Sequence, residues 1–343
     1  MGKCMKRDNY GRNIINQECQ QTSDIMISGC IYTTSVTSLN KRTFSMYLTK
    51  FIPTHLKNLV KSIIGIIRRV ISDNTKKKYN LGIVAIAKNE QDYIKEWVAF
   101  HKVQGVDKII LYNNDSTDNM VEEIKSFIED GYVIYNAIHG EVQQLNAYND
   151  ALKKFSKLFR YLAFIDCDEF LFPVNDNETI FSVIEKTMKM DKNAGGICVN
   201  WVMFGSSGHE KKPEGLLINN FLWRSKLPGP GTNWIKTICN PDLVVKFNHP
   251  HYPIYKRGLY GITPKGNRCV NWCNPITEYV GLRINHYFTK SKAQWIERRK
   301  FDTMNPQKLR TIDQFYKHDT NDIFDDEVLR YKKHLYSILD SYR

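Results

Sequence analysis

The chain has 343 residues, of which 42% are hydrophobic and 12% aromatic, so it can bury the core of one large or two ordinary domains and is globular rather than disordered. Its formal net charge of +13 is concentrated at one end. Residues 1–80 hold 14 Lys and Arg against 4 Asp and Glu, whereas the other 263 residues hold 35 against 32. A nearly neutral body opposes nucleic-acid binding by that body, and we expect no nucleic-acid partner.

Residues 1–45 are polar and show no sustained periodicity, which predicts a flexible segment. They lack the apolar core of a signal peptide, and no run in the chain reaches the roughly 18 apolar residues of a membrane span. Lys6 stands where a myristoylation pattern requires Ser or Thr, so we expect no lipidation. The cysteines form no CxxC pair and share no spacing, which indicates reduced thiols and a cytoplasmic protein. They are Cys4, Cys19, Cys30, Cys167, Cys198, Cys239, Cys269 and Cys273.

A basic amphipathic helix is predicted within residues 46–78, with Thr54 as a candidate N-cap. Basic residues separate the apolar ones, and the segment ends in three lysines at 76–78. Two interpretations fit this pattern: a helix packed on the main domain, or a helix lying on an anionic membrane surface, which would make the protein peripheral. The apolar residues at helical spacing are Leu56, Leu59, Val60, Ile63, Ile64, Ile67, Val70 and Ile71.

Strand-like and helix-like segments alternate from residue 79 to residue 175. Short apolar runs such as LGIVAIA (81–87) and YVIYNAI (132–138) are each followed by a helix-like segment, and Gly105 closes the first helix. A further strand is predicted in RYLAFIDCDEFLF (160–172), and its core part is expected to end at Ile165. This alternation predicts an α/β fold with a mostly parallel sheet that is flanked by helices on both faces.

Polar clusters follow three of these strands: KNE (88–90), NNDSTD (113–118) and DCDE (166–169). Ligands bind at the carboxyl ends of strands in such sheets, so the clusters are expected to line one edge. Unpaired carboxylates in an apolar interior are costly, so positive charge should meet them. In an extended segment Asp166 and Asp168 point the same way and can share one Mg²⁺ or Mn²⁺, while Cys167 turns into the core. The combination favours a nucleotide diphosphate site.

Five segments stand in order along the chain. They begin VAIAKNEQDYIKEW (84), QQLNAYNDAL (143), RYLAFIDCDEFLFP (160), WVMFGSSGH (201) and RINHYFTKS (283). Taken in this order, they resemble glycosyltransferase family 92 and the related family 2-like proteins. The resemblance covers residues 81–300 and implies a GT-A (Rossmann-like) fold, a nucleotide-sugar donor that we expect to be a UDP-sugar, a divalent metal and an inverting transfer. We expect a nucleotide-sugar half at 79–175 and an acceptor half at 176–300. The resemblance thins beyond them, and the helix-like segments there predict C-terminal helices at 301–343.

Carried over residue by residue, the resemblance implies that Asn89, Glu90 and Asp115 contact the nucleoside part of the donor. Asp166 and Asp168 would hold metal and diphosphate, Asp168 more directly, and the role of Glu169 stays open. His286 would supply a further metal or diphosphate contact.

The second half of the chain offers weaker candidates. His209 is either a contact of donor or acceptor or a structural histidine of a turn. Arg283, Lys290 and Lys292 are candidate phosphate partners or solvated surface charges. An inverting transfer needs a carboxylate base, and Glu210 is our candidate, with Glu214 and Asp242 as alternatives.

The sequence therefore predicts a metal-dependent glycosyltransferase that moves a sugar to a glycan or lipid-linked acceptor, at the cytosolic face of a membrane. A nucleotidyltransferase on a similar sheet is an alternative, although AIAKNE (85–90) lacks the glycine-rich loop such enzymes carry after the first strand. The other alternative is a nucleic-acid-binding protein that uses the basic segment 1–80.

Overall fold

The protein is described from a computed structural model that covers residues 53–73, 75–274, 277, 279–298 and 311–343. Residues 53–343 form one compact unit. The predicted flexible segment 1–45, the first residues of the predicted helix 46–78, and residues 301–310 of the predicted C-terminal helices lie outside the described residues.

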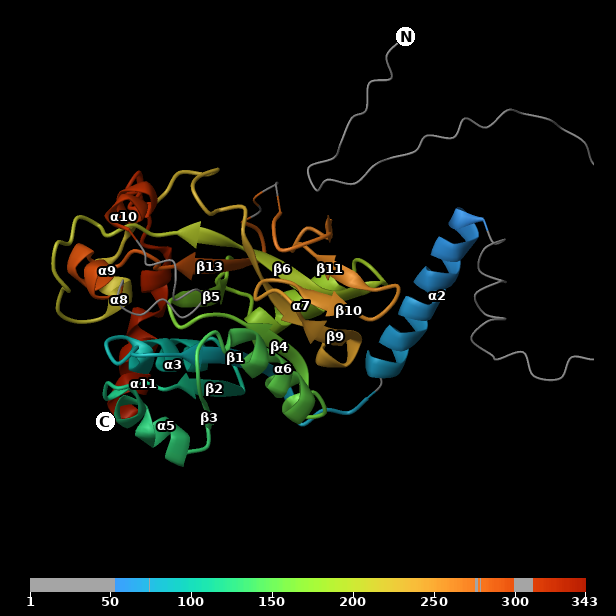
Figure 1. The fold of residues 1–343 in the computed structure, drawn as a ribbon, viewed down its shortest axis with the longest axis horizontal. Helices are drawn as coiled ribbons and strands as arrows, with labels where there is room; N and C mark the ends of the chain where they lie inside the picture. Colours follow the sequence, from blue (N-terminus) through green and yellow to red (C-terminus); the bar gives the residue numbers. More distant parts are fainter. Residues whose placement is uncertain (1–52, 74, 275–276, 278, 299–310) are drawn as a thin grey trace, which may run out of the picture. The chain divides into compact units, whose positions relative to one another are not determined.

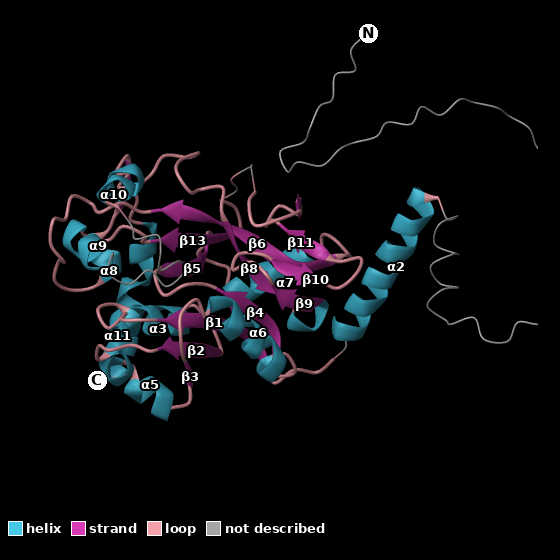
Figure 2. Cartoon of the chain, in the orientation of Figure 1, coloured by secondary structure: helices cyan, strands magenta, loops and turns pink. Residues whose placement is uncertain are grey.

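The described part of the chain is built on a ten-stranded mixed sheet (Figures 1 and 2). The sheet follows the order β12-β11-β6-β8-β4-β1-β2-β3, and β13 joins it by pairing with both β6 and β5. Its strands are β1 Tyr79–Ala87, β2 Lys108–Asn114, β3 Val133–Ile138, β4 Phe159–Phe164, β5 Glu169–Pro173, β6 Ala194–Met203, β8 Ile235–Cys239, β11 Tyr260–Ile262, β12 Arg268–Cys269 and β13 Leu282–His286. Two small sheets pair β9 Val244–Phe247 with β10 Pro253–Tyr255, and β7 Trp223–Arg224 with β14 Ile323–Phe324.

One half of the sheet is fully parallel, because β4, β1, β2 and β3 pair in that order and in one direction. Strand β8 runs antiparallel to both β4 and β6, so β4 and β6 point the same way, and β11 and β13 are parallel to β6. The expected α/β fold with a mostly parallel sheet is confirmed.

Helices cover both faces of this sheet, as alternation along β1 shows. Ile83 and Ala85 pack in the cluster that contains Trp97 of α3, whereas Val84 packs with Tyr148 of α6. Gly105 has φ +77° just beyond α3, where it ends the helix as predicted. The helices are α2 Thr54–Asp73, α3 Ile94–Val103, α4 Met120–Glu123, α5 Lys125–Glu129, α6 Gln144–Phe155, α7 Ile180–Met188, α8 Leu217–Asn220, α9 Lys292–Arg298, α10 Ile312–His318 and α11 Lys332–Ser341, with 3₁₀ turns η1 Pro241–Leu243 and η2 Glu327–Tyr331.

The segment 160–172, predicted as one strand, forms two strands, which corrects the sequence analysis, whereas the predicted end of its core part at Ile165 agrees with the end of β4 at Phe164. β4 ends at Phe164, a turn follows in which the Glu169 N–H donates to the Asp166 carbonyl at 3.1 Å, and β5 begins at Glu169. The reason is tertiary, because β5 leaves the β1 side of the sheet and pairs antiparallel with β13, with Glu169 opposite His286. Asp166 and Asp168 therefore lie in a turn rather than in an extended segment.

The predicted amphipathic helix is present as α2, which begins at Thr54 and ends at Asp73. It packs on the body through Gly65, Arg69 and Ser72, so the interpretation as a helix that contacts the main domain holds for that face. Among the described residues, no helix is long and apolar enough to cross a membrane.

Candidate active site

The polar clusters after β1, β2 and β4 meet at the carboxyl edge of the parallel half, as expected. Strand pairing sets Ala87 opposite Asn113 and Val84 opposite Phe164, so the three strand ends lie side by side. Two cavities, of about 300 and 120 Å³, open there. Their walls share Lys88, Glu90 and Arg298.

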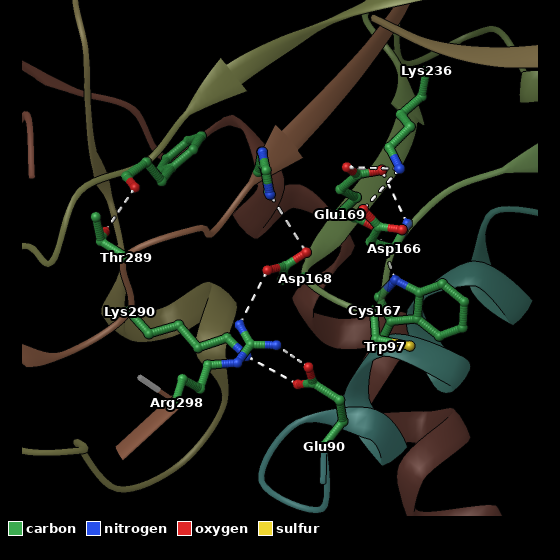
Figure 3. Close-up of polar contacts among 12 residues, drawn as sticks. Glu90, Trp97, Asp166, Cys167, Asp168, Glu169, Lys236, Thr289, Lys290 and Arg298 are labelled. Atoms are coloured by element: carbon green, nitrogen blue, oxygen red, sulfur yellow. Dashed lines mark hydrogen bonds and ion pairs between the residues drawn. The ribbon is translucent and has the colours of Figure 1, made fainter. Parts of the chain in front are cut away.

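A buried lysine meets two of the carboxylates (Figure 3). Lys236 of β8 is 1% exposed, and its Nζ lies 2.7 Å from an oxygen of Asp166 and 3.6 Å from an oxygen of Glu169. Asp166 also accepts from Gln144 Nε2 at 2.8 Å, and the fully buried Glu169 accepts from the Asp166 backbone N–H at 3.0 Å. The positive charge that the sequence required is thus supplied by a strand more than 60 residues away.

The third carboxylate, Asp168, turns to other partners. One of its oxygens lies 3.4 Å from Nε2 of His286 on β13, and the other accepts from Arg298 at 3.2 Å. The Arg298 guanidinium also pairs with Glu90, so it bridges Glu90 and Asp168 (Figure 3). Lys290 Nζ contacts the other carboxylate oxygen of Glu90 at 3.1 Å. Every carboxylate of the cluster therefore has a basic partner.

Burial and neighbouring charge perturb these groups in opposite directions. Burial raises the pKa of Glu169 well above its ordinary value, and the nearby charges of Asp166 and Asp168 add to this against the opposing charge of Lys236. Burial would also raise the pKa of Asp168, but His286 and then Arg298 outweigh it and hold the pKa of Asp168 well below its usual range. The pKa values of the adjacent carboxyl groups of Asp168 and Glu169 are therefore shifted in opposite directions.

Asp168, Glu169 and His286 have a donor set that fits a divalent cation. Each offers one ligand atom, and these three atoms lie within 4.8 Å of one another. Nδ1 of His286 and Oε1 of Glu169 are buried and make no hydrogen bond, although this Oε1 lies 3.6 Å from Lys236 Nζ. Two carboxylates and an imidazole are compatible with Mn²⁺, whereas Mg²⁺ prefers oxygen ligands alone. Asp166, which the sequence analysis placed with Asp168 at the metal, lies outside this group because Lys236 and Gln144 hold its carboxylate.

The loops after β1 and β2 interlock through side-chain contacts. Asn89 and Asp115 both have positive φ, at 56° and 50°, which non-glycine residues rarely adopt. Asn89 Oδ1 accepts from the Thr117 N–H at 2.8 Å. Asp115 accepts from the Gly140 N–H at 2.8 Å and lies 2.6 Å from His139 Nδ1, and these two contacts lower the pKa of Asp115. Asn89 and Glu90 line the larger of the two cavities, whereas Asp115, the residue after β2, lines neither.

Other expected site residues lie away from the cavity walls. His209 places its Nε2 3.1 Å from the carbonyl of Asn220 and packs against Phe221, which fits the structural interpretation of this histidine. Glu210 has a 76% exposed side chain that pairs with Lys292 at 3.4 Å. Neither residue lines the two cavities of the strand edge.

The remaining candidates divide in the same way. Of the three predicted phosphate partners, Lys290 lines the larger cavity, Arg283 is buried against Asp325 at 2.8 Å, and Lys292 is occupied by Glu210. Glu214 is exposed, and Asp242 binds Lys77 at 2.7 Å near the end of α2.

The sequence analysis missed two basic residues of the site, Lys236 and Arg298. Lys236 stands between Ile235 and Thr237 in a fully buried strand, and a lysine there must find a counter-charge. That position was a readable signal. Arg298 ends the short helix α9 in a charged context, and nothing in its neighbourhood marks it.

The fold and the site define an α/β protein with a charged cleft at the carboxyl ends of parallel strands, where such sheets bind phosphorylated ligands. Asp168 lines this cleft and belongs to the buried cation-compatible group. A sequence model of glycosyltransferase family 92 matches residues 84–319, so the chain belongs to glycosyltransferase family 92. The family resemblance of the sequence is confirmed.

Individual relatives are distant. A family 92 protein of Ricinus communis is 24% identical over 177 residues, which is 51% of this chain and 32% of the relative. A family 92 protein of Oryza sativa subsp. japonica is 22% identical over 179 residues, 51% of this chain and 30% of the relative. The chain thus spans about a third of the length of these curated relatives.

Solved structures show weaker likeness. TarS of S. aureus in complex with UDP-GlcNAc is 12% identical, with a TM-score of 0.38 over 77% of this chain and 71% of that one. A putative glucose-1-phosphate thymidylyltransferase from Bacillus anthracis has a TM-score of 0.27 and 11% identity over 40% of this chain and 62% of that one. Likeness at this level carries no conclusion about ligands.

Proposed function

We propose that the protein is a metal-dependent glycosyltransferase that moves a sugar from a nucleotide-sugar donor, a UDP-sugar, to a glycan or lipid-linked acceptor. The observation that carries the proposal is the strand-edge cluster of a family 92 chain, in which Asp168 stands between His286 and Arg298 with Glu169 beside it. Such a site combines a cation-compatible donor set with fixed positive charges. Both can stabilise the negative charge that develops on a departing diphosphate.

The basic residues have a direct role in this proposal. When a sugar leaves a nucleoside diphosphate, negative charge develops on the departing phosphate, and preorganised cations there lower the barrier. Lys290 and Arg298 line the larger cavity, and their counter-ion Glu90 holds both in place. A cation held by Asp168, Glu169 and His286 would supply Lewis-acid stabilisation to the same phosphate.

The donor's nucleoside is proposed to lie over the loops after β1 and β2. Asn89, Glu90 and Asp115 present amide and carboxylate groups there, and hydrogen-bond acceptors of this kind suit ribose hydroxyls. The positive φ of Asn89 and Asp115 supports a binding role, because strained backbone is retained where the surroundings fix it for function.

We also propose a catalytic base on the acceptor side and a cellular location. An inverting transfer requires a base, and Glu210 stays the predicted residue although its carboxylate is exposed. A cytoplasmic location is supported by Cys167, Cys198, Cys239 and Cys269, which are buried free thiols. A peripheral position on a membrane would bring the enzyme to a lipid-linked acceptor.

The test is turnover of a panel of UDP, GDP and CMP sugars with Mn²⁺, with and without EDTA. We expect UDP release by the wild type, and a loss of at least about 10²-fold in Asp168→Asn, which removes one ligand and one charge. Glu122→Gln, a change at an exposed helix position, is the matched control. Mn²⁺ binding measured by calorimetry should be lost in Asp168→Asn and kept in the control.

Each outcome has a distinct meaning. A wild type that turns over none of these donors overturns the proposed transfer. Turnover that is insensitive to EDTA overturns the metal requirement alone. Conversion of a UDP-sugar and added pyrophosphate to UTP and sugar 1-phosphate, in place of nucleoside diphosphate release, identifies the nucleotidyltransferase alternative.

A further inference from the structure

Helix α2 exposes its apolar side to solvent. Seven large apolar residues of this one helix are between 41% and 64% exposed, whereas a helix that serves only the fold buries such residues. Their spacing of three, four and seven places them on a single stripe along the whole helix. A contiguous exposed apolar surface of this kind is typical of an interaction site. The residues are Leu56, Leu59, Val60, Ile63, Ile67, Val70 and Ile71.

The opposite side of α2 is fixed on the body by small and polar residues. A Cβ at Gly65 would lie 2.5 Å from the carbonyl oxygen of Gly258, so the helix approaches that turn as closely as only glycine permits. Arg69 is buried and donates to the carbonyl of Asp191 at 2.6 Å. Ser62 bonds Asn193 at 2.9 Å.

The C-terminal end of α2 is anchored in the same manner. Ser72 is buried and bonds Asn240 at 3.1 Å, just beyond the end of β8. Because specific contacts hold both halves of the helix, it cannot rotate its stripe inward without breaking them.

The charges around the stripe have one sign. Lys57, Lys61 and Arg68 lie along one border between the apolar stripe and the body-facing side, by their positions on the helix. The exposed Lys76 and Lys78 follow the helix. The only acidic residue of α2 is Asp73, which pairs with Arg69 at 3.3 Å.

We propose that α2 docks this protein on an anionic lipid bilayer, with the helix lying flat in the interface. An apolar stripe at the level of the acyl chains and basic residues at the level of the head groups are what such a helix needs. A helix of 20 residues that carries lysines and arginines through its middle lies on a bilayer rather than across it.

Docking in this way leaves the candidate active site open. The anchors of α2 are at the amino end of β6, at the carboxyl end of the antiparallel β8 and at the turn before β11, which together form one edge of the sheet. The site is at the carboxyl ends of β1, β2 and β4, which point the same way as β6, so it occupies the opposite edge. In Figure 1 the arrow of β6 points away from α2. The proposal does not depend on the transfer reaction.

The experiment is flotation of the full chain with vesicles of phosphatidylcholine alone and of phosphatidylcholine with phosphatidylserine. We expect the wild type to bind the mixed vesicles and to release at high salt. The double variant Ile63→Ser/Ile67→Ser should lower the partition coefficient by at least about tenfold, because it removes apolar area that the bilayer would bury. Ile296→Ser on α9, a residue as exposed as Ile63, is the matched control and should bind as the wild type does.

A charge variant tests the second part of the proposal. Lys61→Gln should weaken binding to the mixed vesicles by about fivefold and leave binding to neutral vesicles unchanged. All the substituted side chains are exposed, so thermal unfolding of the variants should match that of the wild type.

Three results would overturn the proposal. The wild type fails to float with the mixed vesicles, or the double variant floats as well as the wild type, which would place any membrane binding elsewhere in the chain. In the third, light scattering shows that the wild type is a dimer and the double variant a monomer, and neither binds vesicles. The stripe would then be a self-association surface.

Discussion

The buried lysine of the strand-edge cluster gives a sharp prediction for stability. We consider Lys236→Met, which keeps the length of the side chain and removes its charge. Lys236 is 1% exposed and stands 2.7 Å from Asp166 and 3.6 Å from Glu169. Since Glu169 is fully buried, it has no access to water once the lysine is gone.

Breaking a buried ion pair by removing one partner costs about 3–5 kcal/mol, because the other charge stays buried and uncompensated. We expect the lower end, about 3 kcal/mol of the free energy of unfolding, for two reasons. Asp166 keeps its bond from Gln144 and is one-third exposed, and the raised pKa of Glu169 lets that residue take up a proton. This is a large part of the roughly 5–15 kcal/mol that stabilises a typical domain.

Lys290→Met is the matched control, because Lys290 is also buried, at 4% exposed. Its partner Glu90 keeps a second cation, Arg298, so this variant should lose only about 1–2 kcal/mol. Urea unfolding followed by circular dichroism measures both. The reasoning is refuted if Lys236→Met loses less than about 1 kcal/mol, or no more than Lys290→Met.

Two further predictions concern carboxyl groups outside the cation-compatible group. Burial raises the pKa of Glu96 from 4.5 to about 7, so the folded state holds a proton that the unfolded state releases. This contribution to stability is complete below about pH 4.5 and is lost as the pH rises through about 7. Relative to the wild type, Glu96→Gln should therefore gain up to ~3 kcal/mol between about pH 5 and pH 8 in urea unfolding, and a constant difference would contradict this. Glu210 is the proposed base, so Glu210→Gln should lower kcat by about 10²–10⁴-fold, and a loss of less than about tenfold, as expected of an exposed carboxylate outside the reaction, would contradict that role.

The local pattern was enough to predict the parallel half of the fold. The apolar runs of β1, β2 and β3, separated by helices that end at glycine, specify their elements without distant partners. The acidic residues 166–169 marked the end of the core part of β4, but a separate strand β5 was not predictable in this way. Apolar residues stand on both sides of the turn, at Ile165 and Phe170, so the local composition is that of one interrupted strand. The separation depends on β13, which pairs Ile284 with Leu171 more than 100 residues later.

The site was predictable in its acids and less so in its bases. Strand ends place Glu90, Asp166 and Asp168 at one edge by topology alone, and the cost of burying them required a cation. The basic residues that meet these acids, Lys236 on β8 and Arg298 on α9, are brought there by tertiary packing, which the local sequence does not indicate. The turn at 166–168 then separates the two aspartates, so that Asp166 faces Lys236 while Asp168 faces His286.

Helix α2 shows why amphipathicity does not fix orientation. The sequence pattern defined the stripe correctly but left open which side meets the body, and the usual expectation is that the apolar side does so. Here Gly65, Arg69 and Ser72 decide it, because close approach and specific hydrogen bonds need small and polar residues. A stripe of aliphatic side chains that stays largely exposed along the helix, beside basic residues, is available to a partner outside the body. The anionic bilayer that we propose as this partner would meet both its apolar and its charged requirements.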